Sequence, residues 1–140
     1  MITAVDTSVL LDIFTDDPTF GAGSLAGLRA CFADGPLVAC DVVWAEISAA
    51  FPDPSAASRA LEAIPVACEP IGRVAAARAG SAWRGYRRDG GPRGRVIADF
   101  LIGAHAFEQA DRLLTRERGF HRMAFDGLVI VDPSASGVGS

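Results

Sequence analysis

Three acidic residues stand in sequence surroundings where an ionised side chain is costly. Asp6 directly follows the mostly apolar residues 2–5, whereas Glu46 and Asp99 each interrupt a longer apolar stretch. Burial of an ionised carboxylate without a partner costs several kcal/mol or shifts its pKa until the group is neutral. We therefore expect these side chains to pair with arginines or to bind a cation. Hard divalent cations such as Mg²⁺ and Mn²⁺ prefer oxygen ligands of this kind.

Each of these acids also has an ordinary structural interpretation. Asp6 could cap the helix that follows it, Asp99 could interact with the dipole of its helix, and Glu46 could pair with an arginine across the core. The two histidines are weak metal signals because neither has a second histidine or a cysteine nearby. We expect His105 to be a packed or capping helix residue and His121 to be a surface residue. The three acids taken together favour a shared site.

The composition narrows the class of protein. The chain has 140 residues, of which 50% are hydrophobic and 21% are charged, as in a single soluble globular domain. All 13 basic residues are arginines, which excludes a Schiff-base lysine and a phosphate-loop lysine. The three cysteines lack C-x-x-C spacing, so we expect neither a disulfide framework nor a zinc ribbon. Without a signal peptide or a membrane-spanning run, we expect a cytoplasmic protein with no membrane partner.

Charge is divided unevenly along the chain. Residues 1–72 contain 2 arginines and 10 acidic residues, a net charge of −8, whereas residues 73–140 contain 11 arginines and 7 acidic residues, a net charge of +4. Five arginines span a Gly/Pro-rich loop in the basic half, where they could hold a polyanion or form a solvated helix face. These five are Arg84, Arg87, Arg88, Arg93 and Arg95.

Short apolar segments alternate with helical patterns along most of the chain. This alternation predicts an α/β fold with a short, mostly parallel sheet covered on both faces by helices. We expect a single domain over residues 1–133 and a flexible Ser/Gly tail over residues 134–140. Glycines weaken the prediction of the second helix. The expected strands are 2–5, 37–40, 66–68, 112–115 and 128–131, and the expected helices are 7–14, 21–32, 43–51, 55–64, 73–87 and 96–109.

Four segments together resemble a PIN domain, and more narrowly the VapC toxins of bacterial toxin–antitoxin pairs. They are residues 5–12 (VDTSVLLD), Glu46 within its helix, residues 95–106 (RVIADFLIGAHA) and residues 113–120 (LLTRERGF). The resemblance covers nearly the whole chain. It implies a three-layer α/β fold with acids at the strand ends that hold Mg²⁺ or Mn²⁺. It also implies metal-dependent cleavage of RNA, a homodimer, and inhibition by a small VapB-like antitoxin.

The resemblance assigns roles to particular residues. Asp6, Glu46 and Asp99 match ligand positions of the family, Glu117 stands where an aspartate is usual, and Thr115 matches the polar position just before it. On this basis Asp6 and Asp99 are metal ligands, and Glu46 is a ligand or accepts a proton from the attacking water. Glu117 and Thr115 position the metal or the water, and the five arginines of residues 84–95 hold the RNA backbone through phosphate contacts. The longer Glu117 side chain could reach the cation from farther away, or it could be a solvated loop residue.

Two other interpretations stay open at this point. The chain could be an inactive PIN-fold binding module whose acidic pocket receives an arginine from a partner, and the unusual Glu117 favours this alternative. A small-molecule phosphatase or phosphoacceptor domain fits an open α/β sheet, but such sites use a lysine that this chain lacks. Asp12 also lies near the site by family analogy. Its i+4 neighbour is Asp16, so we expect Asp12 on a polar face, outside the set of metal ligands.

Overall fold

The structure, a computed structural model, describes residues 1–91 and 96–133. Five strands form one sheet in the order β3-β2-β1-β4-β5, and every neighbouring pair is parallel. The strands are β1 (Thr3–Val5), β2 (Leu37–Cys40), β3 (Val66–Glu69), β4 (Arg112–Leu114) and β5 (Ile130–Val131). The helices are α1 (Thr7–Phe14), α2 (Gly21–Asp34), α3 (Asp41–Ala49), α4 (Pro54–Glu62), α5 (Arg73–Arg88), α6 (Ile97–Gln109) and α7 (Arg118–Ala124).

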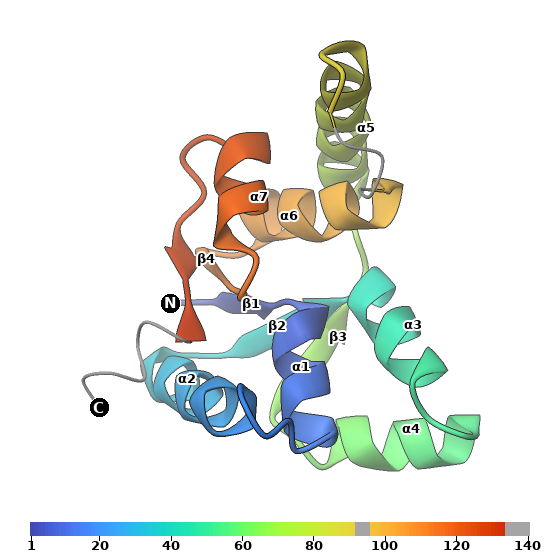
Figure 1. The fold of residues 1–140 in the computed structure, drawn as a ribbon, viewed down its shortest axis with the longest axis vertical. Helices are drawn as coiled ribbons and strands as arrows, with labels where there is room; N and C mark the ends of the chain where they lie inside the picture. The colour runs from blue at the N-terminus through green and yellow to red at the C-terminus, as the bar shows by residue number, and fades with distance from the viewer. Residues whose placement is uncertain (92–95, 134–140) are drawn as a thin grey trace.

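Helices cover both faces of the sheet. Figure 1 shows α1 and α2 on one side of the strands and α6 and α7 on the other, while α5 packs along α6 and projects away from the sheet. All residues of β1 and β2 are buried, as expected for strands covered on both faces. The predicted three-layer α/β fold with a parallel sheet is therefore confirmed. Within the described residues no helix is long and apolar enough to cross a membrane.

The central strand β1 marks a reversal of strand order. The chain proceeds from β1 to β2 and β3 on one side of the sheet, and later to β4 and β5 on the other side. Ligands of open α/β sheets bind in the crevice outside the carboxyl ends of the strands at such a reversal. Asp6, which follows β1, stands at this crevice.

Helix α2 is longer and better defined than its glycines suggest. A Cβ atom at Gly27 would lie 2.9 Å from the Cβ of Pro133, and one at Gly21 would lie 3.2 Å from the carbonyl oxygen of Asp12. These two glycines therefore allow close packing of α2 and do not interrupt it. The weak helix prediction underestimated α2 because it weighed propensity without this packing.

Helix α7 was not predicted. It has only seven residues and carries Gly119 in its first turn, so its helical pattern is short. Phe120 packs edge-to-face against Phe100, with ring centroids 5.1 Å apart, and this contact anchors α7 to α6. The expectation that His121 lies at the surface was wrong, because its exposed fraction is 2%. His105 is a packed helix residue as expected.

Candidate active site

Asp6 is held rigidly between β1 and α1. Its Oδ1 accepts a hydrogen bond from the backbone N–H of Thr7 at 2.7 Å, and its Oδ2 accepts one from the hydroxyl of Thr115 at 2.6 Å. Nε2 of His121 lies 3.4 Å from the same Oδ2. Burial raises the pKa of Asp6, but the hydrogen bond and charge of His121, with the hydrogen bonds from Thr115 and Thr7, bring it below its ordinary value. Asp6 is therefore a fixed, ionised carboxylate.

Glu46 reaches the same region from α3. This helix buries Val43 and Ile47 against the core, which leaves Glu46 on an exposed face. Its Oε1 accepts a hydrogen bond from the hydroxyl of Thr7 at 2.6 Å. The sequence surroundings suggested a buried side chain, but the helical period turns Glu46 out of the core and towards the start of α1.

Asp99 lies in the first turn of α6. Its Oδ2 accepts a hydrogen bond from the backbone N–H of Val96 at 3.0 Å, so this carboxylate caps the helix start. The same side chain lines a cleft together with Asp6 and Glu46. The capping role and the site role, which the sequence left as alternatives, are both compatible with this position.

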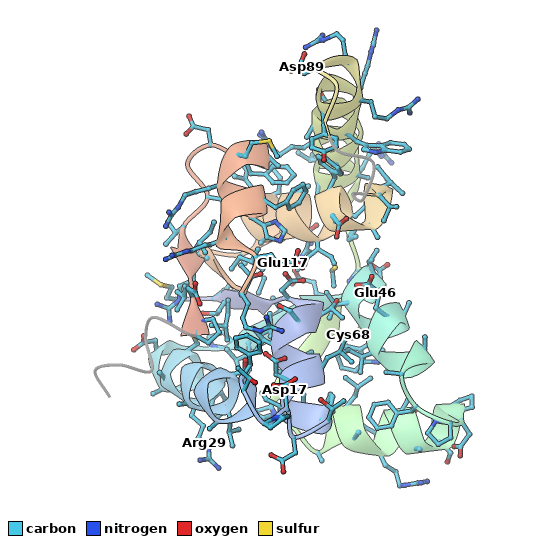
Figure 2. The ribbon with its side chains drawn as sticks, viewed as in Figure 1. Asp17, Arg29, Glu46, Cys68, Asp89 and Glu117 are labelled. Atoms are coloured by element: carbon cyan, nitrogen blue, oxygen red, sulfur yellow. The ribbon has the colours of Figure 1, made fainter. Side chains whose placement is uncertain are left out.

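Glu117 follows β4 directly before α7. Its backbone N–H donates to the Thr115 hydroxyl at 2.9 Å, and this hydroxyl in turn donates to Asp6. One ligand atom each from Asp6, Glu117 and His121 lie within 4.8 Å of one another. Figure 2 shows Glu117 and Glu46 near the N-terminal end of α1, approaching it from different sides. Thr115 thus links the Glu117 backbone to the Asp6 carboxylate.

A cleft of about 500 Å³ joins these side chains. It contains all four acids that the sequence singled out and two further ones. A larger cavity of about 660 Å³ lies between α5, α6 and α7, but it is lined mainly by aromatic and small residues and contains a single acid, Asp89. The smaller cleft is therefore the candidate active site. Its acidic residues are Asp6, Asp12, Asp17, Glu46, Asp99 and Glu117.

Asp12 and Arg116 form an ion pair that sequence reasoning missed. Asp12 is buried, and its two oxygens accept hydrogen bonds from Arg116 Nε at 2.6 Å and Nη2 at 2.9 Å. The hydroxyl of Ser24 donates to Asp12 at 2.7 Å as well. The hydrogen bond to Asp12 raises the pKa of Arg116 above its ordinary value. The expectation of a polar face for Asp12 was wrong, because Asp12 is buried whereas Asp16 is exposed.

Sequence signals for the missed residues existed. Arg116 follows the buried strand β4 within two residues, just as Asp6 follows β1. The reasoning that singled out the Asp6 carboxylate could therefore have singled out the Arg116 guanidinium. His121 stands beside Phe120 and is followed at helical spacing by Ala124 and Phe125, which is an apolar helix face. Nδ1 of His121 has no hydrogen-bond partner among the described residues.

The donor set of the cleft suits a hard divalent cation. Carboxylate oxygens from four separate segments converge there, and they are the ligands that Mg²⁺ and Mn²⁺ prefer. The imidazole of His121 adds one nitrogen next to Asp6. Asp6, Glu117 and His121 could hold such an ion with small side-chain adjustments, and Asp99 and Glu46 line the same space.

Three of the five arginines expected to contact RNA do not line the cleft. Arg84, Arg87 and Arg88 are exposed near the C-terminal end of α5. Figure 2 shows Asp89, the next residue after this helix, at one end of the molecule, whereas Glu117 lies near the middle. Arg93 and Arg95, like the tail at residues 134–140, lie outside the described residues.

Comparisons with known proteins agree with this geometry. The profile of the PIN domain family matches residues 3–126. No curated protein matches the chain. The fold is similar to a solved structure of VapBC2 from Rickettsia felis bound to a promoter DNA fragment, with a TM-score of 0.72 and 18% identity over 94% of this chain and 98% of that one.

Two other solved structures share the fold. VapBC-1 from nontypeable Haemophilus influenzae has a TM-score of 0.73 and 17% identity, over 96% of this chain and 99% of that one. VapC20 from Mycobacterium tuberculosis, described as a toxin that cleaves the sarcin-ricin loop, has a TM-score of 0.54 and 18% identity, over 96% of this chain and 95% of that one. At these identities the likeness concerns the fold.

Proposed function

Because the chain belongs to the PIN domain family, we propose that it is a metal-dependent ribonuclease that acts as the toxin of a toxin–antitoxin pair. In this proposal it hydrolyses phosphodiester bonds in a structured cellular RNA. One observation carries the proposal: Asp6, Glu46, Asp99 and Glu117, which come from four separate segments, line one cleft. Carboxylates that share a cleft repel one another, so their convergence favours a bound cation, and this cation would in turn attract an anionic substrate.

The residues of the cleft suit this chemistry. Asp6 and Asp99 would hold Mg²⁺ or Mn²⁺, with Glu117 and His121 beside Asp6. A bound divalent cation supplies positive charge for the phosphoryl oxygens and lowers the pKa of water. Thr115 and the Thr7 N–H fix the Asp6 carboxylate, so it keeps its place without a rearrangement during the reaction.

Proton transfer is assigned to Glu46. Its carboxylate is exposed to the cleft and is oriented by the Thr7 hydroxyl, so it can accept a proton from a water that attacks the phosphorus. A serine or cysteine nucleophile is not required for this reaction. The arginines of residues 84–95 would bind the RNA backbone.

The proposed partners are an RNA, a small VapB-like antitoxin and a second copy of this chain. Similarity of the fold to the VapBC structures supports an antitoxin partner. Val74 on α5 and Met123 on α7 have exposed fractions of 69% and 60%, and a homodimer interface would cover apolar side chains of this kind. Light scattering at micromolar concentration is expected to give twice the monomer mass.

A cleavage assay tests the proposal directly. The purified chain is incubated with total structured cellular RNA and with a hairpin that carries the sarcin-ricin loop sequence, in Mg²⁺, in Mn²⁺ or in excess EDTA. We expect discrete cleavage with either metal and none in EDTA, since the acids alone repel phosphate. Sustained cleavage in EDTA would contradict the metal mechanism. Absence of cleavage in every condition, with tight binding of an arginine-bearing partner peptide, would favour the inactive binding module.

A further inference from the structure

The candidate cleft has a charge imbalance that matters for an anionic substrate. Six acids line it, and among the described lining residues Arg116 is the single basic one. An RNA phosphate carries one negative charge, so the carboxylates repel it wherever they are not neutralised. A cationic side chain at this position would attract the phosphate and so favour substrate binding.

Arg116 is held in a fixed orientation. Its Nε and Nη2 atoms donate to the two oxygens of Asp12 at 2.6 and 2.9 Å, which is a two-point contact that sets the plane of the guanidinium. The guanidinium carbon also lies 4.0 Å from the ring centroid of Phe20, so the aromatic ring supports one face of the group. The turn before Phe20 is itself held by Asp17, which accepts from the backbone N–H of Phe20 at 2.8 Å.

These contacts leave part of the guanidinium available. An arginine has five N–H donors, and the contact with Asp12 uses Nε and one N–H of Nη2. Across residues 1–91 and 96–133, Nη1 donates no hydrogen bond to the protein. The Arg116 side chain is 26% exposed and lines the cleft, and Nη1 is the guanidinium nitrogen that the contact with Asp12 leaves unused.

Resting on the proposed function, we propose that Arg116 binds the RNA backbone inside the cleft, with Nη1 donating to a non-bridging phosphate oxygen. Asp12 and Phe20 hold the guanidinium in position and do not contact the RNA. The ligand is thus a phosphodiester, and the arginine supplies positive charge to a cleft whose other charged side chains are acids. A role confined to stabilising the fold, by neutralising buried Asp12, makes different predictions.

Paired variants separate the two roles. Replacement of Arg116 alone leaves Asp12 buried without a counter-charge and endangers the fold. The double variant Asp12→Asn/Arg116→Gln removes both charges together and keeps hydrogen-bonding groups of similar size. Asp12→Asn alone keeps the guanidinium, with an amide oxygen that still accepts from it. Comparison of the double variant with Asp12→Asn therefore isolates the positive charge.

Two measurements are made on the full chain. The first is kcat/KM for metal-dependent cleavage, which we expect to be about 10- to 100-fold lower in the double variant than in Asp12→Asn, as for a lost charge-assisted hydrogen bond. The second is binding of a fluorescein-labelled 20-nucleotide RNA in Ca²⁺ at several salt concentrations. Loss of one phosphate contact is expected to reduce the slope of log Kd against log salt by about 0.7.

The outcomes decide between the roles. Equal kcat/KM and equal salt slopes in Asp12→Asn and the double variant would overturn the assignment of Arg116 while leaving a metal-dependent ribonuclease intact. Absence of cleavage by the wild-type chain would instead contradict the proposed function.

A further variant covers the case in which the double variant does not fold. Arg116→Lys keeps one charge against Asp12 but lacks the planar fork that serves two partners at once. We expect it to lose about 10-fold in kcat/KM, and wild-type values in both measurements would overturn the proposal.

Discussion

The cleft at the end of β1 and the arginine-bearing end of α5 (residues 83–89) use charge in opposite ways. In the cleft, Asp6 contacts one donor group each of Thr7, Thr115 and His121. Asp12 is paired with Arg116 through two hydrogen bonds. At the end of α5, Arg88 and Asp89 form an ion pair whose side chains are both 74% exposed. An exposed pair of this kind contributes about 0–1 kcal/mol to stability, whereas breaking a buried pair costs about 3–5 kcal/mol.

This difference separates two tasks in the molecule. Groups that must stand at fixed distances from a reacting phosphate are placed where packing and hydrogen bonds restrict them. Groups that only need to attract a polyanion can stay on a projecting helix, where they lose little side-chain entropy until they bind. The following predictions test this division.

The largest difference is expected from removing one carboxylate at each location. Asp99→Asn should lower metal-dependent RNA cleavage by about 100-fold or more, since even partners behind metal ligands are worth 10- to 100-fold. The amide oxygen of the substituted side chain would still accept from the Val96 N–H, so metal-free thermal stability should be equal or higher. Asp89→Asn, on the exposed end of α5, should leave cleavage unchanged. Cleavage rates and melting curves with and without Mn²⁺ check both variants.

Particular outcomes would contradict the role of Asp99. A divalent metal at one hundred times its Kd should stabilise the wild type by about 2.7 kcal/mol. It should stabilise the Asp99→Asn variant much less. Retained cleavage together with lower stability in both conditions would remove Asp99 from the active site and leave it as a helix cap only.

Glycine substitutions probe packing at the two locations. A Cβ at Gly103 of α6 would lie 2.4 Å from Phe125 and 2.9 Å from Nδ1 of His121, so Gly103→Ala should lower the free energy of unfolding by about 1–3 kcal/mol. Gly80→Ala on α5 meets nothing within 4 Å and should raise it by about 0.5–1 kcal/mol. Urea denaturation measures both. Equal effects would show that the contact between α6 and α7 beside the cleft is no more tightly packed than the exposed face of α5.

The smallest effect is expected from the α5 arginines. Arg87→Glu/Arg88→Glu should weaken RNA binding by at most about 10-fold and flatten its salt dependence, without changing kcat. Arg29→Glu/Arg59→Glu is a matched control, because it makes the same change in net charge at exposed positions of α2 and α4. Fluorescence anisotropy against salt concentration checks the comparison. An unchanged salt slope in the α5 variant would identify that end of the helix as a solvated face.

Local patterns in the sequence were sufficient for most elements of the fold. Nearby residues are enough to identify the apolar runs of β1 and β2 and the helical period of α6. The parallel α/β arrangement follows from the alternation of such strands and helices. Asp6 and Asp99 were recognisable for the same reason, because a charge inside an apolar run is a local signal. The convergence of these acids came from the family resemblance.

What the sequence did not reveal depends on distant partners. Asp12 was misplaced because its environment is set by Arg116, 104 residues away, and no local pattern links the two. The surface prediction for His121 failed because α7 is short and is held by Phe100 on another helix. Glu46 was expected in a buried setting, but α3 exposes it, and the contact with Thr7 of α1 is the distant partner that no local pattern indicates.

The parallel pairing of β1 with β4 has a consequence for the order of synthesis. Thr3 pairs with Arg112, and the hydroxyl of Thr115 bonds to Asp6 across 109 residues of chain. Closure of so long a loop comes late in folding, because its entropy cost precedes the contacts that reward it. A nascent chain that ends before residue 112 holds Asp6 and Glu46 but lacks β4, α7 and the hydroxyl that fixes Asp6. The complete cleft therefore forms only after residues 112–124 have been synthesised.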